Sequence, residues 1–301
     1  HLNKQNLEDG LDLMRACDRS EIPSLTLVHI TQSESELNAK GAWLRDQVVK
    51  RYFHRHHEDV VTVGKRCKQQ LEEFCPYKQL VHRIDNGISL PDKSTRSRGE
   101  GSGFINNLII ENQNFLKSYA ASSLRVVALA RLEPQKNPLR FLEWAERVAG
   151  AVPDARFLWV GDGTLRKQWE YEIKQRKLYE VVFCAGWQTE TYTFLQSAHL
   201  YFHTADYEGK PLALLEAMAH GLPCFLPAHL AEELELDEHS GIVPVDDNDP
   251  LSALKVLQDK QKLQEFGEAA RLRAERDFSM DRVARDYENL YLVAINRNAT
   301  S

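Results

Sequence analysis

The chain has 301 residues, which is more than one average domain and suits two α/β units. Hydrophobic residues make up 43% of it and charged residues 27%, a composition that excludes general disorder. The formal net charge of -6 provides no global positive field, so a nucleic-acid partner has no electrostatic support.

The first third of the chain predicts strands at 25–28 and 59–63, with a helix across about 40–57 between them and another at 65–74. The stretch 92–103 is polar, basic and rich in Gly and Ser, and it predicts a loop or linker. A helical pattern near 106–119 then leads into a second domain. We therefore predict a first domain over residues 1–120.

The helix predicted across 40–57 mixes basic and aromatic side chains. Such a helix is either an ordinary solvated helix or a peripheral contact with a membrane surface or lipid-linked acceptor. The residues concerned are Lys40, Trp43, Arg45, Lys50, Arg51, Tyr52, Phe53 and Arg55. Near its end lie three histidines, His54, His56 and His57, where polar residues are common, so we predict no metal site there.

From residue 124 onward, short and continuously apolar runs alternate with helical patterns. Such runs are typical of strands buried on both faces of a parallel sheet, so the alternation predicts a doubly wound α/β domain over 121–279. The strands are expected at 124–130, 157–160, 181–185, 200–202 and 224–226, and the helices at about 138–150, 164–178, 189–198 and 211–220.

Turn residues support these elements. Asn137 precedes Pro138 as an N-cap, Pro211 opens the helix predicted at 211–220, and Gly221 with Pro223 ends it. The tail after residue 249 is helical with a break near 277–279. Its last helix, 280–298, is expected to pack back on the first domain.

The cysteines are odd in number, widely spread and never in a C-x-x-C pair: Cys17, Cys67, Cys75, Cys184 and Cys224. This pattern predicts neither a zinc site nor a disulfide framework. Cys184 and Cys224 lie in apolar runs and are predicted core residues. Together with the lack of a membrane-length apolar run or secretory signal in the sequence, this predicts a cytoplasmic protein.

Charged residues and glycines follow the ends of the predicted strands of the second domain. Ligands of doubly wound sheets bind outside the carboxyl ends of the strands, so these residues are expected at one edge. They are Arg131 and Lys136 after the first strand, Gly161 and Gly186 after the next two, and Glu208 and Glu216 after the fourth.

The two cations suit an anionic ligand, because arginine offers a planar fork and lysine a compact charge for phosphate oxygens. The helix near Pro211 would add free backbone N–H groups. Glu208 and Glu216 would repel phosphate and are expected to accept hydrogen bonds from sugar or ribose hydroxyls. Each feature alone also fits an ordinary surface residue, but the set predicts a nucleotide-sugar site.

The run from Glu208 to Pro223, E-G-K-P-L-A-L-L-E-A-M-A-H-G-L-P, resembles the signature of the group 1 retaining glycosyltransferases. The stretches 130–136, 153–163 and 182–186 resemble that family in the same order. The resemblance implies the GT-B fold, which has two Rossmann-like domains. The family's first strands and glycine-rich loop have no counterpart here, so the N-terminal domain is expected to be partial.

The resemblance also implies roles for individual positions. Arg131 and Lys136 would bind the donor diphosphate and stabilise the charge on it as it departs. Glu216 would hold the ribose, and Glu208 and His29 would lie near the transferred sugar. The backbone of Gly209, Lys210, Pro211 and Leu212 would support sugar and phosphate, and Gly161, Gly186 and Trp187 would lie near the nucleoside.

The function implied is transfer of a sugar from a UDP- or GDP-sugar to a glycan or lipid-linked acceptor, as in polysaccharide biosynthesis. Transfer would retain the anomeric configuration and need no divalent metal and no cofactor. One alternative is a non-catalytic nucleotide-sugar-binding module, either truncated or regulatory. Another GT-B enzyme, such as an epimerase or phosphorylase, fits the four charged residues less well.

Overall fold

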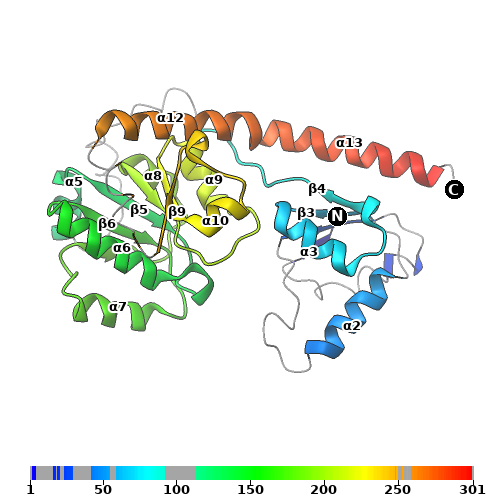
Figure 1. The fold of residues 1–301 in the computed structure, drawn as a ribbon, viewed down its shortest axis with the longest axis horizontal. Coiled ribbons are helices and arrows are strands. Elements are labelled where there is room, and N and C mark those ends of the chain that lie inside the picture. The colour runs from blue at the N-terminus through cyan, green and yellow to red at the C-terminus, as the bar shows by residue number, and fades with distance from the viewer. Residues whose placement is uncertain are drawn as a thin grey trace. The chain divides into compact units, whose positions relative to one another are not determined.

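The computed structural model describes residues 2–4, 16–17, 19–20, 24–29, 42–54, 59–91, 113–247, 249, 253, 256 and 259–299. The linker predicted at 92–103 lies outside these residues, as do Lys40, Arg55, His56 and His57. By their contacts the residues form two compact units (Figure 1). Unit 1 comprises His1–Gly87, Glu208–Pro211 and Met280–Ser301, and unit 2 comprises Ile88–Tyr207 and Leu212–Ser279.

Unit 1 is built on a four-stranded parallel sheet in the order β1-β2-β3-β4. Its strands are β1 (Leu2–Lys4), β2 (Leu25–Val28), β3 (Asp59–Thr62) and β4 (Val81–Arg83). Its helices are α2 (Ala42–Phe53), α3 (Lys65–Phe74), the short 3₁₀ helix η1 (Lys78–Leu80) and α13 (Met280–Ala299).

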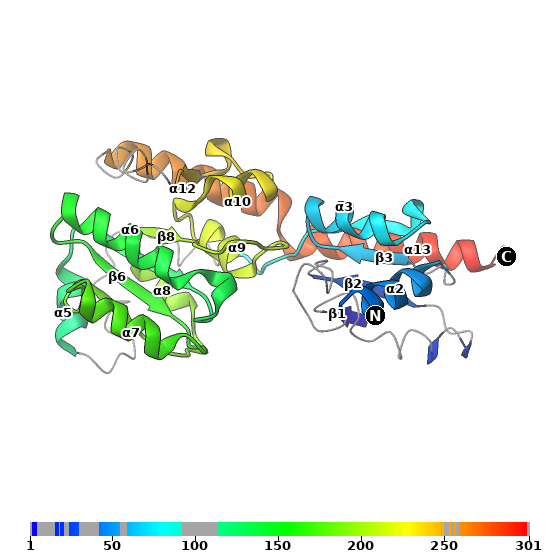
Figure 2. The ribbon, with the colours of Figure 1, turned by 60° about the horizontal axis from the view of Figure 1, so that its bottom comes forward.

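The two faces of this sheet are covered by different helices. Alternate side chains of a strand point to opposite faces, so Val28 and Val60 pack with α2 and α3, while Leu27 and Val61 do not. Leu27 and Val61 instead join Val283 of α13 in a second cluster. Figure 2 shows α13 running along this sheet. The helix that ends the chain thus covers one face of the sheet that begins it.

Unit 2 contains a six-stranded sheet in which every pairing is parallel, in the order β10-β9-β8-β5-β6-β7. Its strands are β5 (Arg125–Leu129), β6 (Arg156–Val160), β7 (Val182–Cys184), β8 (Leu200–Phe202), β9 (Cys224–Pro227) and β10 (Ile242–Val245). Along the chain, strands are added outward from β5 in one direction and then from β8 in the other. This is the doubly wound order, whose switch point lies between β5 and β8.

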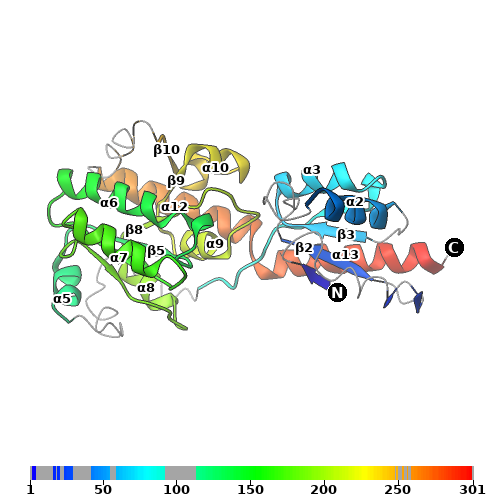
Figure 3. The same cartoon turned by 90° about the horizontal axis from the view of Figure 1, so that it is seen from below.

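The helices of unit 2 lie on both sides of that sheet (Figure 3). They are α5 (Gln113–Ala121), η3 (Pro134–Lys136), α6 (Pro138–Ala151), α7 (Arg166–Gln175), α8 (Tyr192–Ser197), α9 (Leu212–Ala219), α10 (Ala228–Glu233), η4 (Glu238–Ser240) and α12 (Lys260–Asp277). The two parallel sheets with these helices confirm the predicted α/β fold class.

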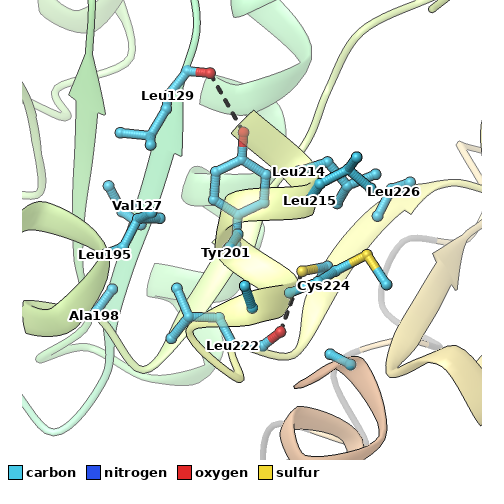
Figure 4. Close-up of a cluster of buried hydrophobic side chains, with 14 of the residues drawn as sticks. Val127, Leu129, Leu195, Ala198, Tyr201, Leu214, Leu215, Leu222, Cys224 and Leu226 are labelled. Atoms are coloured by element: carbon cyan, nitrogen blue, oxygen red, sulfur yellow. Dashed lines mark hydrogen bonds between the residues drawn. The ribbon is translucent and has the colours of Figure 1, made fainter. Parts of the chain in front are cut away.

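Two hydrophobic cores sandwich the sheet of unit 2. Val126 and Ala128 of β5 face α6 and α7, and Val127 and Leu129 face α8 and α9. At the centre of the second core Tyr201 is fully buried, and its hydroxyl donates to the carbonyl of Leu129 at 3.3 Å (Figure 4). A buried phenol therefore spans from β8 to β5, at the switch point, with its polar end satisfied.

Contacts divide the chain after Gly87, earlier than the domain boundary expected near residue 120. The reason is α5, whose Phe115, Leu116 and Tyr119 are buried in a core of unit 2. Phe115 stacks on Phe183 of β7 with ring centroids 5.1 Å apart.

Within the described residues, no helix combines the length and the apolar character needed to cross a membrane.

Candidate functional site

The turns that follow β5, β6 and β7 are joined at the carboxyl edge of the sheet of unit 2. The Leu132 N–H donates to the Asp162 carbonyl at 3.0 Å, and the Gly161 N–H donates to the Gly186 carbonyl at 2.8 Å. Arg131 directly precedes Leu132 in the chain, and Trp187, which follows Gly186, is 71% exposed. The structure therefore brings together the predicted residues Arg131, Gly161, Gly186 and Trp187 on one edge.

Glycine is required where these turns approach most closely. Gly161 has a φ of 137°, and a β-carbon added there would lie 2.0 Å from the carbonyl oxygen of Ala130. Gly186 has a φ of 69°, in the left-handed region that side chains disfavour. Glycine is therefore needed at Gly161 because a side chain would clash, and it is favoured at Gly186 because of the backbone conformation.

A carboxylate that sequence reasoning missed supports the turn that carries Arg131. Glu133 accepts hydrogen bonds from the Thr164 hydroxyl at 2.7 Å and the Thr164 N–H at 3.0 Å. These bonds lower the pKa of Glu133, so it is ionised at neutral pH. Arg131 itself is exposed, and no hydrogen bond or ion pair with another described residue engages its guanidinium.

Hydrogen bonds between the loop after β5 and the loop after β8 hold the backbone of Lys136 in place at the switch point. The Thr204 hydroxyl donates to the Lys136 carbonyl at 3.0 Å, and the Asp206 N–H donates to the Gln135 carbonyl at 3.0 Å. The Gln135 side chain donates in turn to the Tyr207 carbonyl at 3.0 Å. The loop after β5 is thereby tied to the loop after β8, which fixes where Lys136 can place its ammonium.

Asp206 makes further hydrogen bonds between these two loops. Its Oδ1 accepts from Asn137 Nδ2 at 3.0 Å and from Arg140 at 2.7 Å. The Arg140 guanidinium also donates to the Thr204 carbonyl at 2.8 Å and to Asp247 at 3.1 Å. Sequence reasoning did not find this network, because nothing in the local pattern links residues on two loops about seventy positions apart.

Glu216 lies one turn into α9, which begins just after the loop that follows β8. Burial raises the pKa of its carboxyl group, and among the described residues no side-chain hydrogen bond or ion pair compensates. Its backbone carbonyl, by contrast, accepts from the N–H and Nδ1 of His220. A half-buried carboxylate of this kind gains from a ligand that supplies hydroxyl donors.

The remaining predicted residues belong to unit 1. His29 follows β2 and is half-buried, and burial lowers the pKa of its imidazole. Gly209 packs against it: a β-carbon on Gly209 would lie 2.3 Å from the His29 carbonyl oxygen. The structure thus brings together His29 and the segment Glu208–Pro211 within unit 1, while Leu212 and Glu216 belong to unit 2.

The side chain of Lys210 has a defined partner. It is 1% exposed, and its Nζ lies 3.3 Å from Oδ2 of Asp85. Asn86 donates to the Lys210 carbonyl at 2.7 Å. Nothing in the sequence pattern gave a reason to pair Asp85 or Asn86 with Lys210.

Clustered metal ligands are absent from the part of the chain that the structure describes. No group of three or more His, Cys, Asp or Glu side chains in that part is arranged to hold a metal ion. His54, the described member of the three neighbouring histidines, is exposed at the end of α2.

Comparison with known proteins identifies one family profile, described as glycosyl transferases group 1, which matches residues 117–273. The UDP-Gal:alpha-D-GlcNAc-diphosphoundecaprenol alpha-1,3-galactosyltransferase of Escherichia coli is 36% identical over 101 residues, which are 33% of this chain and 26% of that protein. The poly(ribitol-phosphate) alpha-N-acetylglucosaminyltransferase of Staphylococcus aureus is 25% identical over 250 residues, covering 78% of this chain and 49% of that protein. The chain thus spans at most about half the length of these curated relatives.

Among solved structures, HepE of Anabaena in complex with UDP and glucose superposes with a TM-score of 0.77. It is 15% identical and covers 94% of this chain, which in turn covers 75% of that chain. At this identity the likeness shows the fold, and it confirms the predicted GT-B architecture.

Proposed function

The chain belongs to the group 1 glycosyltransferases, and we propose that it transfers a sugar from a nucleotide-diphosphate sugar to a glycan or lipid-linked acceptor. The proposal rests on the residues found at the carboxyl edge of the sheet in unit 2. It presents an exposed arginine, a lysine fixed by its backbone, two glycine turns and a half-buried carboxylate without a hydrogen-bonding partner among the described residues.

We assign the parts of the donor to residues by their chemistry. Arg131 and Lys136 bind the diphosphate, and the Glu216 carboxylate accepts hydrogen bonds from the ribose hydroxyls. Gly161, Gly186 and Trp187 border the nucleoside, and Glu208 and His29 lie beside the transferred sugar. Within the backbone from Gly209 to Leu212, Gly209 and Lys210 support the sugar, and Leu212, the first residue of α9, supports the phosphate.

Arg131 and Lys136 would also stabilise the diphosphate as it departs. Negative charge grows on it as the sugar leaves, and fixed positive groups stabilise that charge without a divalent ion. We therefore propose transfer that is independent of metal and that retains the anomeric configuration. An enzyme that keeps its turnover in EDTA, with a product of unchanged anomeric configuration by NMR, supports this course; loss of turnover in EDTA contradicts the first part.

UDP is the nucleotide we propose, because the Escherichia coli relative is named for UDP-Gal and HepE was solved with UDP. That relative's acceptor is a diphosphoundecaprenol-linked sugar, which supports a lipid-linked acceptor here. A peripheral contact with the inner face of a membrane follows from such an acceptor. In α2, Leu44 is 64% exposed and Val48 48% exposed, and co-sedimentation with phosphatidylglycerol vesicles tests whether this face binds lipid.

Isothermal titration with UDP tests the donor site. Arg131→Ala, Lys136→Ala and Glu216→Ala are each expected to weaken UDP binding by about tenfold or more, since each removes a charged group that binds the ligand. Lys167→Ala is the matched control, because Lys167 is an exposed residue of α7 outside the site. Affinities equal to that of the unmodified protein in all three variants would reject the site.

A non-catalytic nucleotide-sugar-binding module is the alternative, and turnover separates it from the enzyme. UDP release from UDP-glucose, UDP-galactose and UDP-N-acetylglucosamine is measured with and without an undecaprenyl-diphosphate-linked sugar. Release that depends on Lys136 supports the enzyme. Tight UDP binding without any release supports the module.

A further inference from the structure

The segment Glu208–Pro211 is fastened to unit 1 by a buried ion pair. The Lys210 ammonium lies 3.3 Å from Asp85 Oδ2, and the lysine side chain is 1% exposed. A buried ammonium is stable only with a charged partner, because burial removes its hydration. The pair therefore binds Lys210, and the segment with it, to the turn that follows β4.

Asp85 joins several parts of that turn region. Its Oδ1 accepts from the Gly64 N–H at 3.1 Å and from Arg83 Nε at 2.7 Å, and its Oδ2 accepts from Arg83 at 2.9 Å. Burial alone would raise the pKa of Asp85, but Arg83 and Lys210 together hold it below the ordinary value. Asp85 is thus a carboxylate with two cationic partners.

The backbone of the segment fits its surroundings closely. Asn86 donates to the Lys210 carbonyl at 2.7 Å. A β-carbon on Gly209 would lie 2.3 Å from the His29 carbonyl oxygen, and one on Gly64 would lie 2.6 Å from the Gly209 carbonyl oxygen. His29, Gly64 and Asp85 follow β2, β3 and β4, so the segment rests on the carboxyl ends of three neighbouring parallel strands.

We propose that Asp85 and Lys210 are positioning residues for sugar transfer: their ion pair fixes Glu208 and the Gly209 backbone beside His29. This inference rests on the proposed roles of Glu208 and His29 at the transferred sugar. Nothing in it requires Lys210 to touch the nucleotide, since its ammonium is engaged by Asp85. The groups proposed to bind the nucleotide and its phosphates, namely Arg131, Lys136, Glu216 and the Leu212 backbone, all belong to unit 2.

The consequence is a separation of turnover from nucleotide affinity. If the ion pair is lost, the segment shifts and the groups next to the reacting sugar lose their alignment. A misplacement of about 1 Å can lower a rate by about 100-fold. UDP binding, which depends on other residues, should stay the same.

Lys210→Met in the full-length protein is the direct test. It keeps the length of the side chain and leaves Asp85 paired with Arg83, so no carboxylate is left without a cation. UDP affinity is expected to change by less than about twofold, whereas kcat for UDP release from a UDP-sugar should fall by about tenfold or more with little change in KM. Amide exchange at residues 208–210 should become faster, and this readout needs no turnover.

Two further variants sharpen the result. Lys210→Arg keeps the positive charge and should recover much of the turnover and of the exchange protection. Lys78→Met is the matched control, since Lys78 is an exposed lysine of unit 1 outside the site. It should behave as the unmodified protein in every measurement.

Two results would overturn the inference. If Lys210→Met weakens UDP binding by about tenfold while amide exchange is unchanged, the ammonium contacts the nucleotide instead. If neither kcat nor exchange changes, the pair does not position the segment. Failure of the proposed function looks different: Glu216→Ala then leaves UDP binding intact, whatever Lys210→Met does.

Discussion

The α-carbon of Gly209 lies against the carbonyl oxygen of His29, so closely that a β-carbon on Gly209 would come within 2.3 Å of that oxygen. Real β-carbons do not approach a backbone oxygen this closely, and neither partner can rotate away, because both are main-chain positions. The contact fixes the position of the segment Glu208–Pro211 relative to the loop after β2.

Gly209→Ala is therefore expected to push the segment off this loop. Turnover of a UDP-sugar should fall by about 100-fold, while UDP affinity stays within about twofold, since the nucleotide is assigned to unit 2. Kinetics and calorimetry on the same preparation check both numbers. A variant with normal turnover would show that this contact does not matter for catalysis.

Gly161→Ala tests the turn beneath the proposed nucleoside site. The added methyl would meet the Ala130 carbonyl at 2.0 Å, and alanine disfavours a φ of 137°. We expect the free energy of unfolding to fall by about 3 kcal/mol or more, in line with strained backbone and overpacking together. Urea denaturation measures this.

Gly150→Ala is the matched control for Gly161→Ala. Gly150 lies inside α6 with open space where a β-carbon would stand. Alanine is the better helix former, so this variant should gain about 0.5–1 kcal/mol. Equal losses in the two variants would contradict the steric argument.

Asp206→Ala tests the hydrogen bonds that connect the loops after β5 and β8. It removes the acceptor for Asn137 and Arg140, so the loop that carries Lys136 loses part of its support. UDP affinity should fall by about fivefold and the melting temperature should decrease. Asp247→Ala removes a bond to Arg140 at 3.1 Å and leaves the Asp206 bonds in place, so it should have a much smaller effect on both.

Glu216→Gln separates stability from binding. Burial raises the pKa of Glu216, so the folded state favours the protonated form. The stability at this position is fully present below the pKa of the unfolded chain, and it is lost as the pH rises through the folded-state pKa. Glutamine cannot ionise, so the variant should melt higher than the unmodified protein at pH 7, and this difference should vanish on acidification.

The same variant should bind UDP about tenfold more weakly at pH 7, because the amide is a poorer acceptor than the carboxylate for two ribose hydroxyls. Thermal melts from pH 4 to 8, with and without UDP, measure both effects. A variant that is less stable than the unmodified protein at pH 7 would show that Glu216 has a structural partner.

Many elements follow from the sequence because they depend on neighbouring residues. The helix at 65–74 and the strand at 25–28 were predicted with the observed bounds. Asn137 caps α6 by accepting from the Arg140 N–H at 3.1 Å, and Gly221 ends the α9 region with a φ of 72°. Cys184 and Cys224 are buried as predicted.

Strands β10 and β4 were missed for physical reasons. β10 contains Pro244, which counts against a strand, yet β10 pairs with β9 alone among the described strands and can tolerate a residue without an N–H. β4 is short, and its His82 and Arg83 are polar, so no apolar run marks it. Both lie at the ends of their sheets as described, where the constraint on composition is weakest.

The contacts that shape the candidate site could not be predicted from local pattern. Asn86 and Lys210 are 124 positions apart, and Asn137 and Asp206 are 69 apart. The residue types at these positions fit a solvated surface equally well. Their pairing is decided by the chain path, which brings loops of different strands together.

The way the chain is distributed over the two units has a practical consequence for protein engineering. Unit 1 is assembled from three separate stretches, one of which is only the tetrapeptide Glu208–Pro211. A chimera that exchanges the first unit with that of a relative must therefore transplant this tetrapeptide and the terminal helix as well. A single crossover after Gly87 would keep Lys210 of this chain but replace Asp85, its partner, with the residue of the relative.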